Sequence, residues 1–172
     1  YTRKFGADGE LDENGVIRKI GVCPRPYQDP HPLISQPVTG GMTSLLSCAK
    51  HGWLPWIWEG DPPKFLEMCR TYQRVAAENG FAFSLGQNAG CVRAICIGDT
   101  REEAFQLAAD STGYSYQEYF GHFGFLELFR NPEDDPNVRP WRFKSNEEAV
   151  KRMIEKKYQL CGTVDDVKRE LE

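Results

Sequence analysis

The sequence predicts an α/β fold built from parallel strand–helix–strand units. Short apolar runs at 33–38, 53–58 and 91–97 alternate with longer segments whose apolar residues recur every three or four positions. This alternation is typical of a parallel sheet, either an open doubly wound sheet or part of a (β/α)8 barrel. The sequence contains neither a G-x-G-x-x-G motif nor a P-loop, which weakens the nucleotide-fold interpretation.

The first third of the chain predicts two strands joined by a proline-rich segment. Asn14 and Gly15 form a turn dipeptide that leads into a strand over 16–23. Prolines between 26 and 32 predict a rigid, extended approach to the next strand, because proline fixes its own φ and favours extended geometry before it. That strand covers 33–38.

Three segments that follow have clear start and stop signals. A helix over 42–51 begins after a Gly-Gly pair and ends at Gly52. The aromatic run 53–58 predicts a buried strand. A long amphipathic helix over 63–79 starts at a Pro-Pro pair, where proline is tolerated.

The second half contains a strand at 91–97 and three helix starts. Thr100 with Glu103, and Ser145 with Glu148, have the spacing of capping boxes. Thr163 is the expected N-cap of the last helix. Residues 113–144 lack a clear period and predict an insertion or lid within a single domain spanning 1–172.

Composition and charge exclude two classes of function. The chain has 172 residues, a formal net charge of −4 and no long Lys/Arg cluster, which argues against nucleic acid as a partner. No apolar run is long enough to cross a bilayer, so we expect a soluble protein without a membrane partner. The six cysteines are widely spaced and the three histidines lack ligand-spaced partners, which predicts reduced thiols, a cytoplasmic location and no metal site.

The Gly-Gly turn is the principal candidate site. Glycines let the backbone approach a phosphate closely, nearby hydroxyls add donors, and a helix N-terminus supplies partial positive charge. The alternative is a tight turn with a Ser/Thr cap. The candidate cofactor-binding residues are Gln36, Thr39, Gly40, Gly41, Thr43 and Ser44.

A second candidate region follows the strand at 53–58. Core packing is the default interpretation of its tryptophans, but Trp58 and Glu59 lie nearest the loop and are the candidate substrate-pocket residues. The aromatic segment 114–129 either covers a hydrophobic substrate or packs against a partner subunit. No triad or carboxylate pair is evident, so no catalytic residue is assigned.

Three segments, in this order, resemble the luciferase-like flavin-dependent monooxygenase family. The resemblance covers about residues 16–172, and its motifs are a proline-rich entry strand, a D-T-x-E-E-A helix start and a G-T-x-x-x-V helix start. The matching residues are Pro24, Pro26, Gln28, Pro30, His31 and Pro32; then Asp99, Thr100, Glu102, Glu103 and Ala104; then Gly162, Thr163 and Val167.

The resemblance implies a (β/α)8 TIM barrel that holds reduced FMN, or in some branches F420, at the C-terminal ends of its strands. Because such a barrel needs about 250 residues, this chain would be its C-terminal portion, and both of its ends look cut. The expected activity of the complete protein is monooxygenation of a small organic substrate with O2 and reduced FMN from a separate flavin reductase. The fragment alone is expected to be inactive, and a homo-oligomer is left open.

Two alternatives remain at this stage. One is an F420-dependent hydride-transfer reductase on the same fold. The other is a non-catalytic flavin-binding protein on a degenerate barrel.

Overall fold

The computed structural model describes residues 8–19, 27–39 and 41–172, which divide into one unit up to Leu33 and another from Ile34 to Glu172. The first unit holds a turn centred on Asp12, whose carboxylate accepts hydrogen bonds from the backbone N–H groups of Asn14 and Val16, both at 2.9 Å. These bonds close the loop beneath an isolated antiparallel bridge between Leu11 and Ile17.

The strand predicted at 16–23 and the extended segment predicted between 26 and 32 are both wrong over the residues that the structure describes. Residues 16–19 form one bridge and no strand, because Asp12 binds the N–H of Val16 that a ladder would need; residues 20–23 lie outside the described residues. Residues 27–30 bend, and the side chain of Tyr27 is fully exposed. Proline fixes φ alone, so the intervening residues stay extended only when a neighbouring strand holds them. Pro24 and Pro26 also lie outside the described residues.

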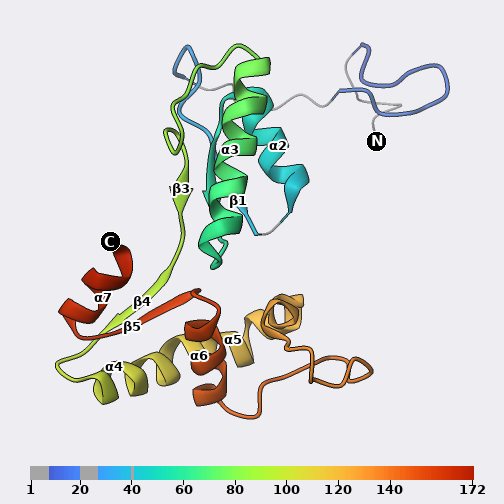
Figure 1. Ribbon diagram of the computed structural model, residues 1–172. Coiled ribbons are helices and arrows are strands. Elements are labelled where there is room, and N and C mark those ends of the chain that lie inside the picture. Colours follow the sequence, from blue (N-terminus) through green and yellow to red (C-terminus); the bar gives the residue numbers. More distant parts are fainter. Residues whose placement is uncertain (1–7, 20–26, 40) are drawn as a thin grey trace. The chain divides into compact units, whose positions relative to one another are not determined.

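The second unit alternates strands with helices (Figure 1). Its elements are β1 (Ser35–Val38), α2 (Met42–His51), β2 (Leu54–Ile57), α3 (Pro62–Glu78), β3 (Gly90–Cys91), β4 (Ala94–Ile97), α4 (Arg101–Ala108), a π-helical turn (Ala109–Gly113), α5 (Tyr114–Glu118), two 3₁₀ turns (Phe120–Phe123 and Phe125–Phe129), α6 (Asn146–Glu155), β5 (Gln159–Gly162) and α7 (Val164–Leu171).

The strands form two parallel sheets, in the orders β1-β2-β3 and β4-β5. The expected single strand at 91–97 is therefore divided, because the chain changes partner midway. Val92 N donates to Ile57 O at 2.9 Å, whereas Ala94 N donates to Tyr158 O at 3.1 Å. Across the part of the chain that the structure describes, closure into a barrel is not seen. The fold is a mixed α/β arrangement with parallel strands.

Helices cover one face of each sheet. The buried cluster beneath α2 and α3 joins Val38, Leu45, Ile57 and Tyr72. In the β4-β5 sheet, Cys96 and Cys161 are register partners that pack among apolar residues of α4 and α6. The opposite faces carry apolar side chains in the open: Trp56, Ile95 and Ile97 are 44%, 50% and 46% exposed.

The observed helix boundaries confirm most of the helix start and stop residues predicted from the sequence. α2 ends where Gly52 adopts a left-handed φ of 68°, and α3 follows its Pro-Pro start. Thr100 and Ser145 accept hydrogen bonds from the third N–H of α4 and α6.

The two predicted capping boxes are only half formed. The carboxylates of Glu103 and Glu148 bind the N–H before each cap, on Asp99 and Lys144, at 2.8 and 2.6 Å. Both carboxylates therefore bind the residue before the cap instead of making the reciprocal bond to the cap itself. The shorter Asp166 makes that bond to Thr163 N at 3.2 Å and completes the box of α7.

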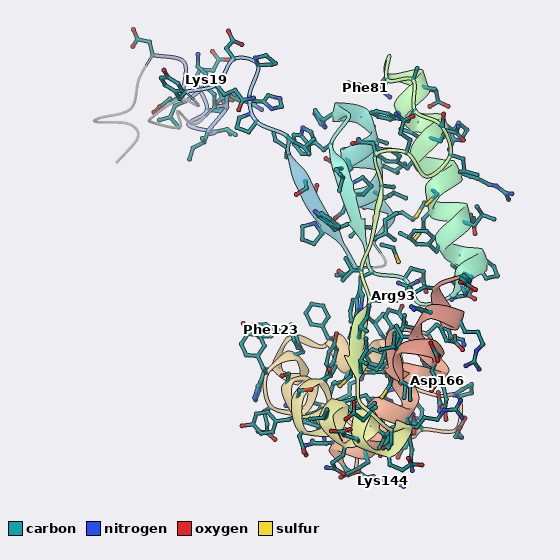
Figure 2. All side chains as sticks on the ribbon, turned by 90° about the vertical axis from the view of Figure 1, so that its left-hand side faces the viewer. Lys19, Phe81, Arg93, Phe123, Lys144 and Asp166 are labelled. Atoms are coloured by element: carbon teal, nitrogen blue, oxygen red, sulfur yellow. The ribbon has the colours of Figure 1, made fainter. Side chains whose placement is uncertain are left out.

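The segment predicted as an insertion, 113–144, begins inside helical structure and becomes irregular after Phe129. Arg152 of α6 anchors its irregular part through an ion pair with Asp134, and its guanidinium lies 5.0 Å from the Trp141 ring. The ion pair lowers the pKa of Asp134 to about 2. Figure 2 shows how densely side chains fill the region around the β4-β5 sheet. Among the described residues, no helix combines the length and apolarity needed to span a membrane.

Candidate functional site

The turn between β1 and α2 carries most of the predicted cofactor-binding residues. Val38 at the end of β1 is fully buried, and Thr39 after it is exposed. Gly41 is the N-cap of α2, with φ −87° and ψ 114°, and no side chain caps this helix. Gly40 lies outside the described residues. The buried end of β1 is thus followed by an exposed turn that leads directly into α2.

The start of α2 is open to a ligand. A Cβ built on Gly41 would meet nothing within 4 Å. The first turn contains Thr43 and Ser44 but no acidic residue, so no carboxylate within that turn competes with an anion for its N–H groups and hydroxyls. An anion such as a phosphate ester fits this donor set. The structure therefore brings together Thr39, Gly41, Thr43 and Ser44.

Gln36 does not join this group. It lies two residues before Val38 on the same side of β1, and its Oε1 accepts a hydrogen bond from the Cys48 thiol of α2 at 3.5 Å. The side chain therefore links β1 to the flank of α2, away from the helix start.

The turn after β2 is closed by packing. Trp58 is only 8% exposed, because four aromatic rings surround it. The ring centroids of Tyr158, Phe125, Tyr116 and Phe129 lie 4.9, 5.8, 6.0 and 6.2 Å from that of Trp58. Within this chain the indole has little surface left for a ligand.

Glu59 is held in place on the other side of the same turn. Its Oε1 accepts hydrogen bonds from Asp61 N at 2.9 Å and from the Tyr158 hydroxyl at 3.3 Å. Burial, with the nearby Glu59 carboxylate as a second cause, raises the pKa of Tyr158. The tyrosine stays protonated near neutral pH and can keep donating to Glu59.

Two cavities adjoin these turns. One, of about 280 Å³, is lined by charged residues that include Glu59, Asp61 and Lys64. The other, of about 260 Å³, lies between Thr39 and the aromatic segment and is lined also by Phe123, Gly124, Phe125 and Leu128. Sequence reasoning missed these four individual positions. The only signal was the aromatic content of 114–129 as a whole.

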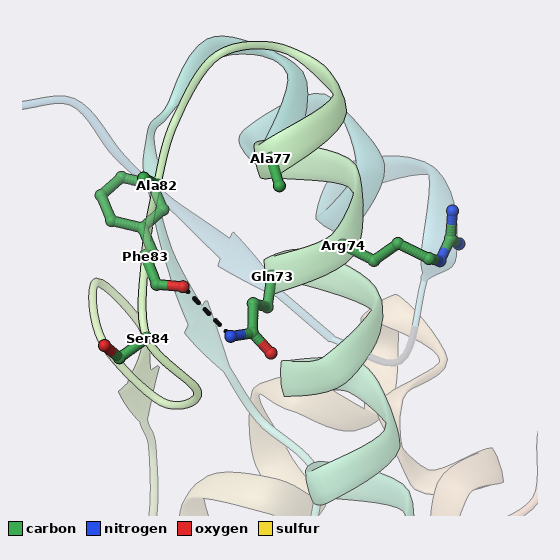
Figure 3. Close-up of a pocket in the computed structure, with 6 residues that line it drawn as sticks. All are labelled: Gln73, Arg74, Ala77, Ala82, Phe83 and Ser84. Atoms are coloured by element: carbon green, nitrogen blue, oxygen red, sulfur yellow. Dashed lines mark hydrogen bonds between the residues drawn. The ribbon is translucent and has the colours of Figure 1, made fainter.

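A larger cavity, of about 520 Å³, lies against α3 and the chain at 82–84 (Figure 3). Gln73 Nε2 donates a hydrogen bond to the carbonyl oxygen of Phe83 at 3.1 Å. This stretch leads into the N-terminal end of β3, the side of a parallel α/β arrangement that serves stability, whereas sites form at the C-terminal ends of strands. We therefore place the candidate site at the β1 and β2 turns.

The histidines serve local roles. His31 Nδ1 contacts the Pro32 carbonyl at 2.7 Å, and His51 stacks on Trp53 with ring centroids 4.6 Å apart. His122 lines a separate polar cavity with Glu118 and Arg142. Among the described residues, no group of three or more potential metal ligands gathers.

Comparison with known proteins gives a likeness in fold. No family model matches the chain, and no curated protein matches its sequence. Among solved structures, it is similar to the oxygenating constituent of 3,6-diketocamphane monooxygenase from Pseudomonas putida, a type II Baeyer-Villiger monooxygenase in complex with FMN. That match has a TM-score of 0.59 at 16% identity and covers 81% of this chain and 37% of the other.

A second similar structure is the monooxygenase RslO1 from Streptomyces bottropensis. It has a TM-score of 0.57 at 16% identity and covers 87% of this chain and 39% of the other. The chain thus spans less than two fifths of the length of either protein. The parallel α/β fold is shared with part of each monooxygenase.

Proposed function

We propose that this chain is the C-terminal portion of a luciferase-like (β/α)8 barrel, and that the complete protein is an FMN-dependent monooxygenase acting with O2 on a small organic substrate. The observation that carries the proposal is the open strand–turn–helix at Thr39–Ser44, in a fold shared with part of two monooxygenases, one of them in complex with FMN.

The uncovered sheet faces support the barrel. Parallel sheets occur almost only with both faces covered, yet Trp56, Ile95 and Ile97 are about half exposed on the faces away from the helices. Among the described residues β1 and β5 are edge strands, and further parallel strands beside them would enclose these side chains as barrel interior. The matched structures have that additional length.

The phosphate of FMN is assigned to the β1–α2 turn. The N–H groups at the start of α2 and the hydroxyls of Thr39, Thr43 and Ser44 would hold it, with Gly40 and Gly41 allowing close approach. Gln36 supports the turn from beneath through Cys48. Bound reduced FMN supplies the electrons that activate O2.

The β2 turn forms the fixed wall of the site. The aromatic cluster around Trp58 excludes water from one side, and Tyr158 fixes the Glu59 carboxylate through its hydroxyl. A dry, rigid wall favours oxygen chemistry, because water would otherwise intercept the reactive species.

The partners follow from the proposed chemistry. The family that the chain resembles takes reduced FMN from a separate flavin reductase, and we propose the same partner for the complete protein. The five described cysteines are free thiols, and we propose a cytoplasmic location on that ground. A homo-oligomer remains compatible with the exposed aromatic residues of 114–123.

Binding of FMN and of riboflavin tests the phosphate assignment. Gly41→Asp places a carboxylate at the helix start, where it favours the N-cap but repels a phosphate. We expect the variant to bind FMN about tenfold more weakly and riboflavin unchanged, as measured by flavin fluorescence. Gln87→Glu adds the same charge at an exposed position and is the matched control. Equal FMN affinity in wild type and Gly41→Asp would refute the assignment.

Turnover separates the alternatives. A monooxygenase forms an oxygenated product when the complete protein is given reduced FMN, O2 and substrate. An F420-dependent reductase instead changes the F420 absorbance under anaerobic conditions. A non-catalytic flavin-binding protein does neither while still binding FMN.

A further inference from the structure

Two cysteines are neighbours in the parallel β4-β5 sheet, whose strands run side by side (Figure 1). Cys96 of β4 and Cys161 of β5 are register partners. Because register partners point to the same face of a sheet, both side chains pack against one buried cluster of Ala108, Ala109 and Val150. Both are free thiols, and neither is fully buried. The sheet thus presents a pair of thiols on one face.

The spacing of the two strands suits a bridging ion better than a direct sulfur–sulfur bond. Neighbouring strands lie about 4.8 Å apart, and side chains that leave the sheet in the same direction keep about that separation. A disulfide requires Cβ atoms about 3.5–4.5 Å apart and sulfurs about 2.05 Å apart, so the strands would have to approach each other. Two collinear metal–thiolate bonds of about 2.3 Å hold their sulfurs about 4.6 Å apart, which leaves both strands in place.

The chemistry of the thiols limits the kind of cation. Burial raises the pKa of both thiols, that of Cys161 to about 11 with the neighbouring Cys96 thiol as a further cause. Both are therefore protonated near neutral pH, and a bound cation must displace both protons. Soft cations such as Cu(I) bind thiolates strongly enough to do so, and two thiolates complete their ligand set. Zinc takes four ligands, and within the described ranges no group of three or more His, Cys, Asp or Glu side chains gathers.

A cavity connects the pair with solvent. Its volume is about 510 Å³, and Cys161 lines it together with Phe105 and Ile154. Arg101 and Glu102 also line the cavity, and both are exposed. A cation can reach Cys161 by this route. The charge of the complex, one negative unit for Cu(I) with two thiolates, stays partly hydrated there, which limits the cost of burying it.

We propose that Cys96 and Cys161 form a two-coordinate site for a single soft cation of the Cu(I) class. Binding forms two copper–sulfur bonds, releases both thiol protons to water and changes no oxidation state. Because β5 is an edge strand among the described residues, the cation fastens this edge to β4. The site goes beyond the proposed function and uses none of the residues assigned to FMN.

Titration of the reduced chain with Cu(I), under anaerobic conditions and in competition with a chromogenic Cu(I) chelator, tests the site. Cys96→Ala and Cys161→Ala should each weaken Cu(I) binding at least about a hundredfold, because one remaining thiolate loses the advantage of two linked ligands. Alanine keeps this face of the sheet apolar, and circular dichroism confirms that each variant is folded. Cys91→Ala is the matched control: it removes an exposed cysteine of β3 whose register partner is Ile57, and should leave the binding unchanged.

X-ray absorption spectroscopy of the copper-loaded chain identifies the ligands directly. We expect two sulfur ligands and no nitrogen or oxygen ligand, and we expect Zn(II) to bind more weakly than Cu(I) in the same titration. Equal weakening in Cys91→Ala and Cys161→Ala, a loss in only one of the two strand variants, three or more ligands, or equal affinity for Zn(II) would each overturn the proposal. Failure of FMN to bind would leave this result unchanged.

Discussion

The turns after β1 and β2 hold equivalent positions in successive strand–helix units, but they are built in opposite ways. The β1 turn is exposed and uncapped, and Gly41 has open space around it. The β2 turn is enclosed: Trp58 is buried among four rings, and a Cβ on Gly60 would lie 1.9 Å from the Lys156 carbonyl oxygen. One turn is therefore available to a ligand, whereas the other holds the structure together.

This contrast separates two groups of predicted site residues that looked alike in the sequence. Both followed a buried strand and contained glycine. Only the tertiary surroundings distinguish an exposed turn from one whose side chains are already packed or hydrogen-bonded. The substitutions below test that distinction through stability, from the largest expected effect to the smallest.

Truncation of Trp58 should give the largest loss. Trp58→Ala removes the centre of the aromatic cluster and leaves a cavity that the rings cannot refill, so we expect the free energy of unfolding to fall by about 3–5 kcal/mol. Urea denaturation followed by circular dichroism measures it. Trp56→Ala is the control, because its indole is 44% exposed. An equal loss in the two variants would show that Trp58 is not the packing centre.

A methyl group at each turn glycine compares the two turns directly. Gly60→Ala forces the backbone away from Lys156, and we expect a loss of about 2–3 kcal/mol. Gly41→Ala meets no atom and has an ordinary φ, so we expect a change of less than about 1 kcal/mol. Thermal and urea unfolding of both variants give the values. A large loss at Gly41 would contradict the open turn.

Alkaline pH should loosen the β2 turn. Because burial and Glu59 raise the pKa of Tyr158 above its ordinary value of 10, the unfolded chain releases this proton first as the pH rises. The stability contributed by the neutral tyrosine is complete below pH 10 and is lost as the pH climbs through the higher folded-state pKa. Tyr116 acts in the same direction, because burial raises its pKa also.

The melting temperature measured between pH 8 and 11.5 checks this effect. Tyr158→Phe should flatten the decline above pH 10, whereas Tyr114→Phe, which removes a hydroxyl from an exposed ring, should keep the wild-type slope. Identical slopes in all three proteins would count against a role for Tyr158 ionisation.

Elements with local signals could be predicted from the sequence. α2 was placed at its observed bounds, because its glycine stop and apolar period are contained in the segment itself. The start of α7 was found from Thr163 as N-cap with Asp165 and Asp166 in the first turn. Asp166 completes the cap and also binds Arg101 of α4 at 2.5 Å. The second contact joins positions 65 residues apart, and no local pattern reports it.

Elements defined by pairing were missed. β5 has only four residues, begins with the buried Gln159, and is a strand because β4 lies beside it. The single strand expected at 91–97 divides for the same reason. In the candidate site, the glycine turn was visible locally, whereas Phe123 and Leu128 reach Thr39 only through the folding of a distant segment.

The change of partner at Val92–Ala94 has a consequence for how the protein opens. Amides on either side of it belong to one continuous stretch of chain, yet they are released by different events: the N–H of Val92 when β2 separates, and that of Ala94 when β5 separates. Hydrogen exchange along this stretch should therefore report two opening free energies within three residues. A thermal fluctuation can break the hydrogen bonds of the β1-β2-β3 sheet while the β4-β5 sheet stays intact, or the reverse.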